Sequence, residues 1–412
     1  MEKELQAAIE KAKVVSFDIF DTLIVRTYKR PTDLFRHLEL TEKAEGFAKE
    51  RMAGEAKARQ NARAASKREE VSLGEIYRVM DNRFAGLKDK EIDLEKLACR
   101  QNAEMKSVYD ECLAMGKRII IASDMYLPYE VIEAILKENG YEGYEKLFLS
   151  SHTMRPKATG KMYQDMLSYL EIPAEELLHI GDHPYTDGEM ARQKGLESYL
   201  YLPIRETKGN IPNASYFATL NRYEDKSLVP SLLEGLIAQH SAKYPGESYW
   251  EGFGYKYAGI MAAGYMKWLK GELDKRGIRK VFFMMRDGYI FKKVFDKFYD
   301  GYDSKEIYGS RTMFMLAGME SYDMDLRLHV TGLPQKGLTY RRCYERLSVE
   351  NEKLWEDYCR TFTNLDETLL REEDFRAVDQ FFEEHEEELK RMGQAERNLL
   401  LEYFESIGLF EG

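Results

Sequence analysis

Three apolar runs in the first half of the chain are each followed at once by side chains that could take part in chemistry. The run at 14–17 precedes Asp18, the run at 118–122 precedes Ser123, and the run at 177–180 precedes Gly181 and Asp182. If these runs are parallel strands, their carboxyl ends share one sheet edge, where ligands gather in α/β proteins. An aspartate there could attack phosphorus as a nucleophile, and carboxylate oxygens suit a hard cation such as Mg²⁺.

Two further side chains fit the same group. Lys157 follows Arg155 and Pro156 just ahead of a predicted helix, where a fixed ammonium could point into the site. Lys161 would lie on the helix itself, so Lys157 is the preferred residue. Asp187 follows Asp182 within the same polar segment. Each residue alone is most often a turn former or a surface group, but their joint order along the chain favours one shared site.

The elements that must position these residues alternate between strand and helix. Predicted strands lie at 14–17, 118–122, 146–149, 177–180 and 198–202, and predicted helices at 129–139, 159–170 and 186–194. Repeated strand–helix units of this length form a parallel sheet with right-handed crossovers and helices on both faces. The fold class is therefore α/β, with a doubly wound parallel sheet.

The rest of the chain divides into an insert, a linker and a second domain. Residues 31–116 are charged and alanine-rich with helical spacing of apolar residues, and residues 206–227 are polar and irregular. A C-terminal α/β domain is expected at 228–412, mostly helical, with strands at 279–285 and 305–308. Its last predicted helix, 394–407, ends where an α/β pattern would continue into a strand, so this domain is expected to be truncated.

Composition limits the function and the compartment. The chain has 412 residues and a formal net charge of -11, which argues against a nucleic-acid partner bound through a basic face. No apolar run approaches the length of a membrane span, and the N-terminus lacks the apolar core of a signal peptide. The four cysteines show no metal-binding spacing. A cytoplasmic protein with no membrane partner is expected.

Four segments, taken in order along the chain, resemble the four motifs of the haloacid dehalogenase (HAD) superfamily. They are Asp18-Ile19-Phe20-Asp21-Thr22-Leu23, Ser123, Lys157 and the segment 181–187. The resemblance covers residues 1 to about 205. It implies a HAD-like Rossmannoid fold whose catalytic core is residues 1–30 and 117–205. The insert at 31–116 then corresponds to a helical cap domain, which closes over the site and favours a small diffusible substrate.

The resemblance also implies roles for the site residues. Asp18 would be the nucleophile of a phosphatase that forms an aspartyl-phosphate. Mg²⁺ would be held by the Asp18 and Asp182 carboxylates and the backbone carbonyl of Phe20, and Asp187 would hold a metal-bound water or support the ligands. The remaining roles fall to three side chains: Thr22 would orient the loop, Ser123 would bind a phosphate oxygen, and Lys157 would neutralise both nucleophile and phosphate.

Phe20 departs from the family pattern. Typical phosphatases of the superfamily carry an aspartate at this position to protonate the leaving alcohol, and such help is worth about 10²–10⁴-fold. Asp21 would point to the opposite side in extended geometry. Three outcomes stay open: a slow or leaving-group-selective phosphohydrolase, an enzyme whose acid comes from elsewhere, and a fold retained for binding.

One alternative to a phosphatase is a dehalogenase. The dehalogenase branch of the superfamily also lacks this aspartate and needs no metal. Asp182 and Asp187 here retain an acidic pair, which favours phosphate over halide.

The second half of the chain shows a separate resemblance. The segment 279–289 and Gly309-Ser310-Arg311 resemble a region of bacterial proteins of surface-polysaccharide and glycosyltransferase systems. This likeness suggests a partner in polysaccharide biosynthesis.

These observations together predict a cytoplasmic, Mg²⁺-dependent HAD superfamily hydrolase that acts on a small phosphorylated metabolite, with a sugar phosphate as one candidate. The alternative is a non-catalytic or weakly active protein that binds a phosphorylated ligand and docks a partner in glycan assembly.

Overall fold

A computed structural model describes residues 3–203, 227–244, 246–332, 337–348 and 350–411. The expected linker at 206–227 lies outside the described residues apart from Ser227. The chain divides into two compact units, Met1–Ala258 and Gly259–Gly412, which are described separately. Among the described residues, no helix has both the length and the apolar character needed to cross a bilayer.

The first unit is built on a five-stranded sheet of order β5-β4-β1-β6-β7. Every neighbouring pair is parallel. The strands are β1 (Val14–Phe17), β4 (Arg118–Ser123), β5 (Lys146–Leu149), β6 (Leu177–Gly181) and β7 (Glu197–Leu200). This arrangement confirms the predicted α/β class with a parallel sheet, and each predicted strand is present to within two residues at either end.

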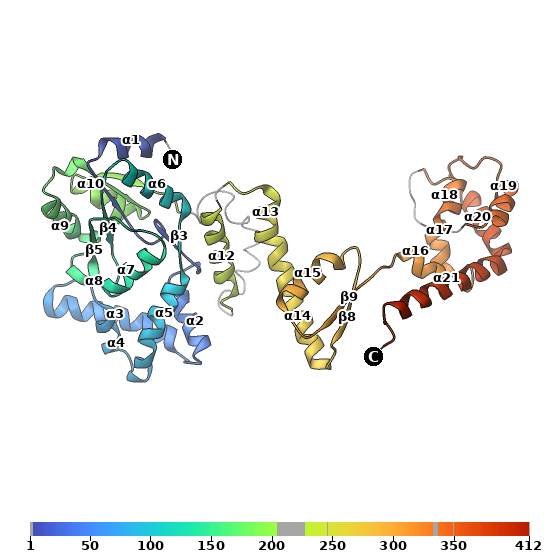
Figure 1. Cartoon of the computed structure of the whole chain (residues 1–412), viewed down its shortest axis with the longest axis horizontal. Helices are drawn as coiled ribbons and strands as arrows, with labels where there is room; N and C mark the ends of the chain where they lie inside the picture. Colours follow the sequence, from blue (N-terminus) through green and yellow to red (C-terminus); the bar gives the residue numbers. More distant parts are fainter. Residues whose placement is uncertain (1–2, 204–226, 245, 333–336, 349, 412) are drawn as a thin grey trace. The chain divides into compact units, whose positions relative to one another are not determined.

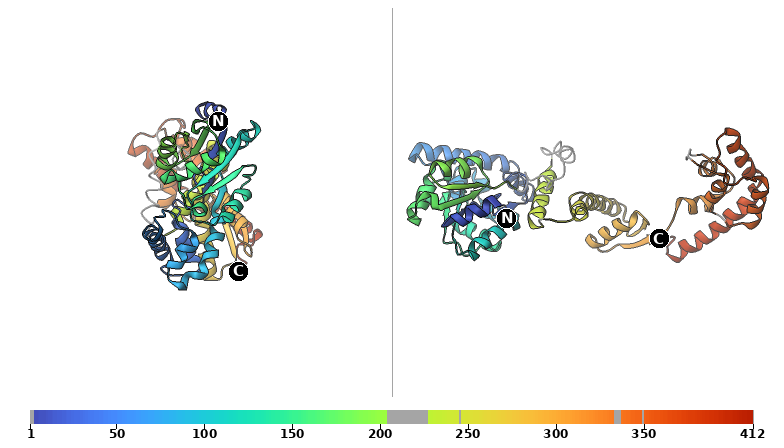
Figure 2. Two further views of the ribbon diagram at one scale, coloured as in Figure 1. Left: turned by 90° about the vertical axis from the view of Figure 1, so that its left-hand side faces the viewer. Right: turned by 90° about the horizontal axis from the view of Figure 1, so that it is seen from above.

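Helices cover both faces of this sheet because successive side chains of each strand point to opposite sides. Val15 and Phe17 pack with α1 (Lys3–Lys11), α6 (Ala103–Ala114) and α7 (Tyr129–Glu138). Val14 packs on the other face with α9 (Lys161–Leu170) and α10 (Ala191–Gln193). The two helical layers are seen on either side of β4 and β5 in Figure 1, and Figure 2 gives two further views. The sheet is therefore doubly wound.

The segment predicted as a helix at 186–194 has a less regular form. It is a π-helical turn, η4 (Pro184–Met190), followed by the short α10. Short elements also connect the other strands: α8 (Ser150–Thr153), η2 (Lys157–Thr159) and η3 (Ala174–Glu176). Two of these irregular turns, η2 and η4, lie at the carboxyl ends of strands and carry predicted site residues.

The insert forms a helical layer with its own core. Its helices are α2 (Asp33–Thr41), α3 (Phe47–Ser66), α4 (Leu73–Val79), η1 (Asn82–Leu87) and α5 (Lys88–Ala98). The Leu73 amide donates to the Tyr126 carbonyl at 2.8 Å, and the Ser150 hydroxyl donates to Glu70 at 2.7 Å. Because Tyr126 and Ser150 follow β4 and β5, the insert lies at the carboxyl edge of the sheet.

The residues that form the insert differ from the expected range of 31–116. A short antiparallel ribbon of β2 (Ile24–Arg26) and β3 (Cys99–Gln101) connects it to the sheet domain, and no strand was predicted there. The following helix, α6, packs against the sheet and shares its core. The sequence placed α6 in the cap because a helix on a sheet and a helix in a bundle have the same apolar spacing.

The expected start of the second domain near Leu228 also differs from the structure. Helix α12 (Val229–Lys243) packs against β2 and β3, and its Gln239 amide donates to the Val25 and Ala98 carbonyls at 3.0 and 2.7 Å. A side chain at Gly235 would collide with the Thr27 backbone, at 2.0 Å. The first unit continues through α13 (Tyr249–Phe253) and most of η5 (Gly254–Gly259).

The second unit contains the predicted strand–helix–strand segment and then helices. Its first elements are α14 (Ile260–Arg276), β8 (Lys280–Met284), α15 (Gly288–Phe298) and β9 (Asp303–Ile307), with β8 parallel to β9. The helices that follow are α16 (Arg311–Gly318), α17 (Met324–Val330), α18 (Tyr340–Arg346), α19 (Glu352–Thr361), α20 (Glu372–Glu384) and α21 (Glu386–Ser406). Most of these helices share an aromatic core around Tyr358 and Phe382.

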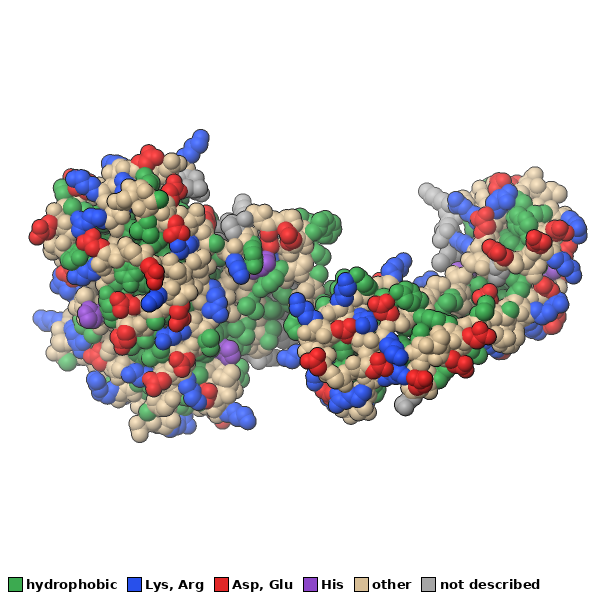
Figure 3. Space-filling view, in the orientation of Figure 1, with side chains coloured by type: hydrophobic (Ala, Val, Ile, Leu, Met, Phe, Trp, Pro, Cys, Tyr) green, Lys and Arg blue, Asp and Glu red, His purple; other side chains and the backbone are tan. Residues whose placement is uncertain are grey.

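Charged side chains of both signs are interspersed on the face of the first unit seen in Figure 3. No continuous basic area appears on that face. This distribution agrees with the net charge of -11.

Candidate active site

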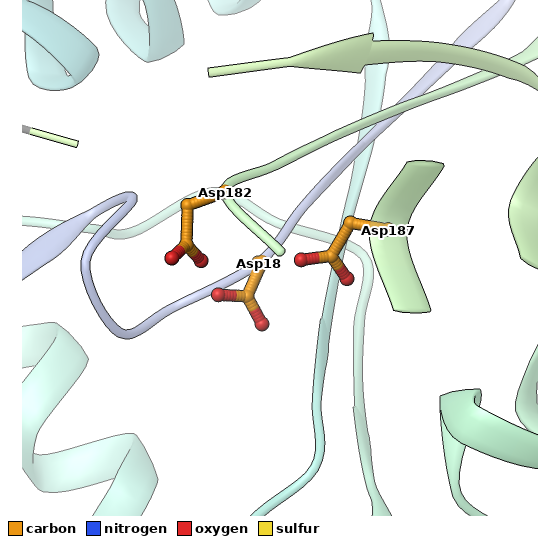
Figure 4. Close-up of side chains that lie close together, drawn as sticks. All are labelled: Asp18, Asp182 and Asp187. Carbon is orange, nitrogen blue, oxygen red and sulfur yellow. The ribbon is translucent and has the colours of Figure 1, made fainter. Parts of the chain in front are cut away.

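Three aspartates converge at the carboxyl edge of the sheet (Figure 4). Asp18 follows β1, Asp182 follows β6, and Asp187 lies in η4. One oxygen of each carboxylate lies within 4.8 Å of the others. The strand register explains the approach of the first two, since β1 pairs with β6 and the Asp18 amide donates to the Ile180 carbonyl at 2.8 Å.

Lys157 is the buried cation of this site. Its Nζ lies 2.6 Å from Asp18 Oδ1 and 2.6 Å from Asp187 Oδ1, and the residue is 2% exposed. Burial alone would disfavour the ammonium, but the two carboxylates hold the pKa of Lys157 well above its usual range. Lys161 is exposed at the start of α9. The side chain predicted from its place ahead of the helix is thus the one in contact with the aspartates.

Asp124 holds the turn that carries Lys157. The Lys157 amide donates to Asp124 Oδ1 at 2.8 Å, and the Ala158 amide donates to Oδ2 at 3.3 Å. The loop after β4 is therefore tied to η2. The sequence analysis gave a role to Ser123 and none to Asp124, although an aspartate next to a predicted strand end was a signal for such backbone contacts.

A buried histidine supports Asp187. His179 Nε2 lies 3.1 Å from Asp187 Oδ1, and its Nδ1 lies 2.9 Å from the Ser16 hydroxyl. Burial lowers the pKa of His179 despite the nearby carboxylate, so the neutral ring donates from Nε2 and accepts the Ser16 proton at Nδ1. No role was predicted for His179 or Ser16. The only indication in the sequence was that each is a polar residue within an apolar strand.

The second oxygen of Asp187 is also bound, because the His183 amide donates to Oδ2 at 3.1 Å. A side chain at Gly181 would meet Asp187 Cγ at 2.5 Å, so the carboxylate needs a glycine beside it. The exposed His183 ring accepts from the Tyr185 and Thr186 amides and so caps η4.

The electrostatics of the site show an excess of negative charge. Burial raises the pKa of Asp18 to about 7, opposed by Lys157 and reinforced by Asp187. Burial and the charges of Asp18, Asp21 and Asp187 raise the pKa of Asp182 to about 8. Asp187 behaves oppositely: burial raises its pKa, but Lys157 and the hydrogen bond from His179 together outweigh burial and hold the pKa well below the usual range. One ammonium does not neutralise three carboxylates.

These residues fit a magnesium ion. Their donors are carboxylate oxygens on separate elements, the chemistry that Mg²⁺ prefers, and a divalent cation would supply the missing positive charge. Asp18 and Asp182 have oxygens available for direct contact, whereas both oxygens of Asp187 accept protein hydrogen bonds. The supporting role of Asp187 and the ligand role of the Phe20 carbonyl stay predictions.

Ser123 and Thr22 have different surroundings. Ser123 ends β4, the neighbour of β1, and is buried at the same sheet edge as Asp18. Thr22 is fully buried, and its carbonyl accepts from the Asn102 amide at 2.8 Å. Its hydroxyl has no hydrogen-bond partner among the described residues. Phosphate binding by Ser123 and loop orientation by Thr22 stay predictions.

The loop after Asp18 directs Phe20 toward the insert. The guanidinium carbon of Arg26 lies 3.7 Å from the centre of the Phe20 ring, and Arg26 Nε donates to Glu95 of α5 at 2.6 Å. Asp21 has a left-handed backbone with φ of 59°. A left-handed residue is not extended, so Asp21 does not follow the extended geometry assumed for it.

Comparisons with known proteins give a limited result. No family model and no curated protein matches the chain. One similar solved structure is an L-2-haloacid dehalogenase, with a TM-score of 0.36, 15% identity, and coverage of 50% of this chain and 90% of that chain.

A HAD family enzyme from Bacteroides thetaiotaomicron has a TM-score of 0.35, 13% identity, and coverage of 47% and 94%. A mutant of this Bacteroides thetaiotaomicron enzyme, in complex with magnesium and inorganic phosphate, has a TM-score of 0.31 and 14% identity. These scores are too low to transfer an activity to this chain.

Proposed function

We propose that this protein is a Mg²⁺-dependent, HAD-like phosphatase that hydrolyses a small phosphorylated metabolite through an aspartyl-phosphate on Asp18. The contact of Lys157 with both Asp18 and Asp187, beside Asp182, carries the proposal. This combination supports the proposal because it brings a carboxylate that could act as nucleophile, a fixed positive charge and two further carboxylates to one sheet edge.

Each residue has a part in the proposed reaction. The ionised Asp18 carboxylate attacks phosphorus, and Lys157 neutralises charge on the transferring phosphoryl group. Asp18 and Asp182 would hold a Mg²⁺ ion, which would supply further positive charge there. His179 and the His183 amide fix the Asp187 carboxylate that holds Lys157. The Ser123 hydroxyl would bind a phosphate oxygen.

The insert supports a small substrate. It lies at the carboxyl edge of the sheet and is fixed to the loops after β4 and β5. We assign it the role of a cap that limits access to Asp18, which favours a diffusible metabolite over a phosphoprotein.

The test is hydrolysis of nitrophenyl phosphate and acetyl phosphate with and without Mg²⁺. Asp18→Asn should abolish turnover and the acid-stable labelling of the protein by phosphate, while leaving the fold intact. Asp110→Asn is a matched control, since Asp110 is an exposed residue of α6 that pairs with Lys106. Turnover of Asp18→Asn equal to that of the natural protein would overturn the proposal.

A second function is favoured by one observation, the apolar Phe20 ring held by Arg26 at a position beside the nucleophile. On this alternative the first unit binds a phosphorylated ligand without hydrolysing it, and the protein docks a partner in polysaccharide biosynthesis. Calorimetry that detects Mg²⁺-dependent phosphate binding by a protein that does not turn over activated phosphates would support it. Halide release that is insensitive to EDTA would instead favour a dehalogenase.

The compartment is part of the proposal. All four cysteines are free, three of them buried, which agrees with the reducing cytoplasm.

A further inference from the structure

We infer that this site acts on phosphorylated compounds whose leaving group departs without being protonated: acyl phosphates, phosphoanhydrides and phosphates of acidic phenols. This inference rests on the proposed function and narrows its substrate class. Two observations carry it: the loop after the nucleophile holds the apolar ring of Phe20, and Lys157 and His179 beside Asp18 and Asp187 already have partners.

The direction of the leaving group follows from the geometry of displacement. The attacking and leaving oxygens lie roughly in line through phosphorus. Since Asp18 attacks from the edge of the sheet, the leaving oxygen faces away from β1, toward the insert. A proton donor for it must therefore come from the loop after Asp18 or from the insert.

Phe20 occupies that loop and cannot donate a proton. Its ring packs against the core of the sheet domain and is covered by Arg26 at 3.7 Å. Arg26 is in turn fixed by Glu95, and both side chains are less than 8% exposed. A buried ion pair with a stacked ring is a rigid arrangement, so the apolar group is a constant part of the site. Arg26 remains protonated under all ordinary conditions and is no proton donor either.

The other titratable groups around Asp18 have partners. The Lys157 ammonium is shared by Asp18 and Asp187. Both nitrogens of His179 are engaged, by Asp187 and Ser16. Each contact holds its group in a set protonation state and orientation, which leaves no free acid among them.

Asp182 would hold the ion in the proposed reaction and would then be ionised, so it has no proton to give. Two other polar groups near the site are Asp124 and His183. Asp124 accepts two backbone amides, and the His183 ring accepts two more as the cap of η4. Asp21 lies in a left-handed turn directly after Phe20, and a variant of it is included in the experiment for that reason.

The chemistry of the first step then depends on the leaving group. An Asp18 oxygen forms a bond to phosphorus, the bond from phosphorus to the leaving oxygen breaks, and the electron pair leaves with that oxygen. A carboxylate, a phosphate or a nitrophenolate is stable as the resulting anion, whereas an alkoxide is not. Without general acid help an alcohol leaving group loses about 10²–10⁴-fold in rate.

The second step regenerates the enzyme. A water oxygen bonds to phosphorus, the bond to Asp18 breaks, and its electron pair returns to the carboxylate. The water proton leaves with the released phosphate or passes to solvent. With no general base among the engaged groups this step is slow, so the phosphoryl-enzyme should accumulate on mixing with an activated substrate.

The experiment compares leaving groups on the full-length protein with Mg²⁺. Dinitrophenyl, nitrophenyl and phenyl phosphate form a series of decreasing leaving-group acidity, with acetyl phosphate and glycerol phosphate as acyl and alkyl members. We expect kcat/KM to fall steeply along the series, with glycerol phosphate at least about 100-fold below acetyl phosphate. Phe20→Leu should preserve the steep dependence, and Asp21→Asn should preserve it as well.

The outcomes separate the two proposals. Equal kcat/KM for alkyl and activated phosphates, or a steep dependence that appears only in Asp21→Asn, would overturn the inference and keep the phosphatase. In the second case Asp21 would be the proton donor. The absence of both turnover and phosphoryl-enzyme with every substrate would overturn the phosphatase and the inference together.

Discussion

The guanidinium carbon of Arg26 lies 3.7 Å from the centre of the Phe20 ring, and Glu95 holds Arg26 in place from the insert at 2.6 Å. This relationship connects the loop of the nucleophile to helix α5 of the insert. A cation over an aromatic face contributes up to about 2 kcal/mol when desolvated. The base of the insert and the chemistry beside Asp18 are therefore determined by the same three side chains.

Replacement of Phe20 by an acid should restore little general acid catalysis by itself. In Phe20→Asp the new carboxylate would meet the Arg26 guanidinium, which keeps a carboxylate ionised and lowers its pKa by about 1–3 units. We expect kcat/KM for glycerol phosphate to rise by less than about tenfold. Steady-state kinetics against Phe20→Asn, a polar control without a proton to give, tests this. A gain near the full range of general acid catalysis would contradict it.

Removal of Lys157 should reduce activity far more than removal of its neighbour Lys161. Lys157→Met leaves Asp18 and Asp187 without their shared cation, and we expect a loss of kcat of at least about 10²-fold. Lys161→Met removes an exposed ammonium and should leave kcat within about twofold of the natural protein. Equal kinetics for Lys157→Met and the natural protein would contradict the assigned role.

Magnesium affinity should increase with pH. The pKa values of Asp18 and Asp182 are raised to about 7 and about 8, and a bound ion needs both carboxylates ionised. Protons therefore compete with Mg²⁺ at about pH 6 and no longer do so near about pH 9. Isothermal titration calorimetry at both values should show the tighter binding at the higher one. A constant or opposite trend would argue against these two ligands.

The same shifts determine a trend in stability. The folded-state pKa values exceed those of the unfolded chain, about 4, so the folded metal-free protein binds more protons in this range. The contribution of Asp18 and Asp182 to the free energy of unfolding is therefore complete below about pH 4 and is lost as the pH rises through about 7 to 8. Added Mg²⁺ should restore stability at the higher pH, as a thermal shift in Tm.

Loss of His179 should destabilise the fold and disturb Asp187. His179→Leu removes a hydrogen bond to a buried carboxylate and leaves the Ser16 hydroxyl without its partner, at a cost of about 1–3 kcal/mol. His179→Gln keeps an amide donor and should recover part of the loss. Ser16→Ala is the matched control and should cost about 1 kcal/mol. Urea denaturation with Mg²⁺ absent measures all three, and an unchanged midpoint for His179→Leu would contradict the role.

The sequence was sufficient to predict the sheet and to predict that Asp18, Asp182 and Lys157 lie together at its edge. Apolar runs such as Val14–Phe17 are buried on both faces of a parallel sheet, so they are recognisable without knowledge of their neighbours. The carboxyl ends of parallel strands share one edge, which is why Asp18 and Asp182 could be placed together from order alone. The position of Lys157 ahead of its helix was likewise sufficient to prefer it over Lys161.

Only the tertiary structure decided which other groups complete the site. The hydrogen bonds that join Ser16 to His179 and His179 to Asp187 depend on the register of β1 and β6, which no local pattern encodes. The left-handed turn at Asp21 is a backbone state that an aspartate adopts only where the surrounding loop requires it.

The limits of the insert and of the first unit were decided in the same way. The spacing of apolar residues in α6 and α12 shows that each helix has a buried face and does not show what covers it. Packing of α6 on the sheet and of α12 on the β2–β3 ribbon supplied that information. The order of apolar and polar residues in the sequence thus determines which side chains are buried and which strands are followed by aspartates. Contacts between residues distant in sequence determine which groups those side chains pack against or bind.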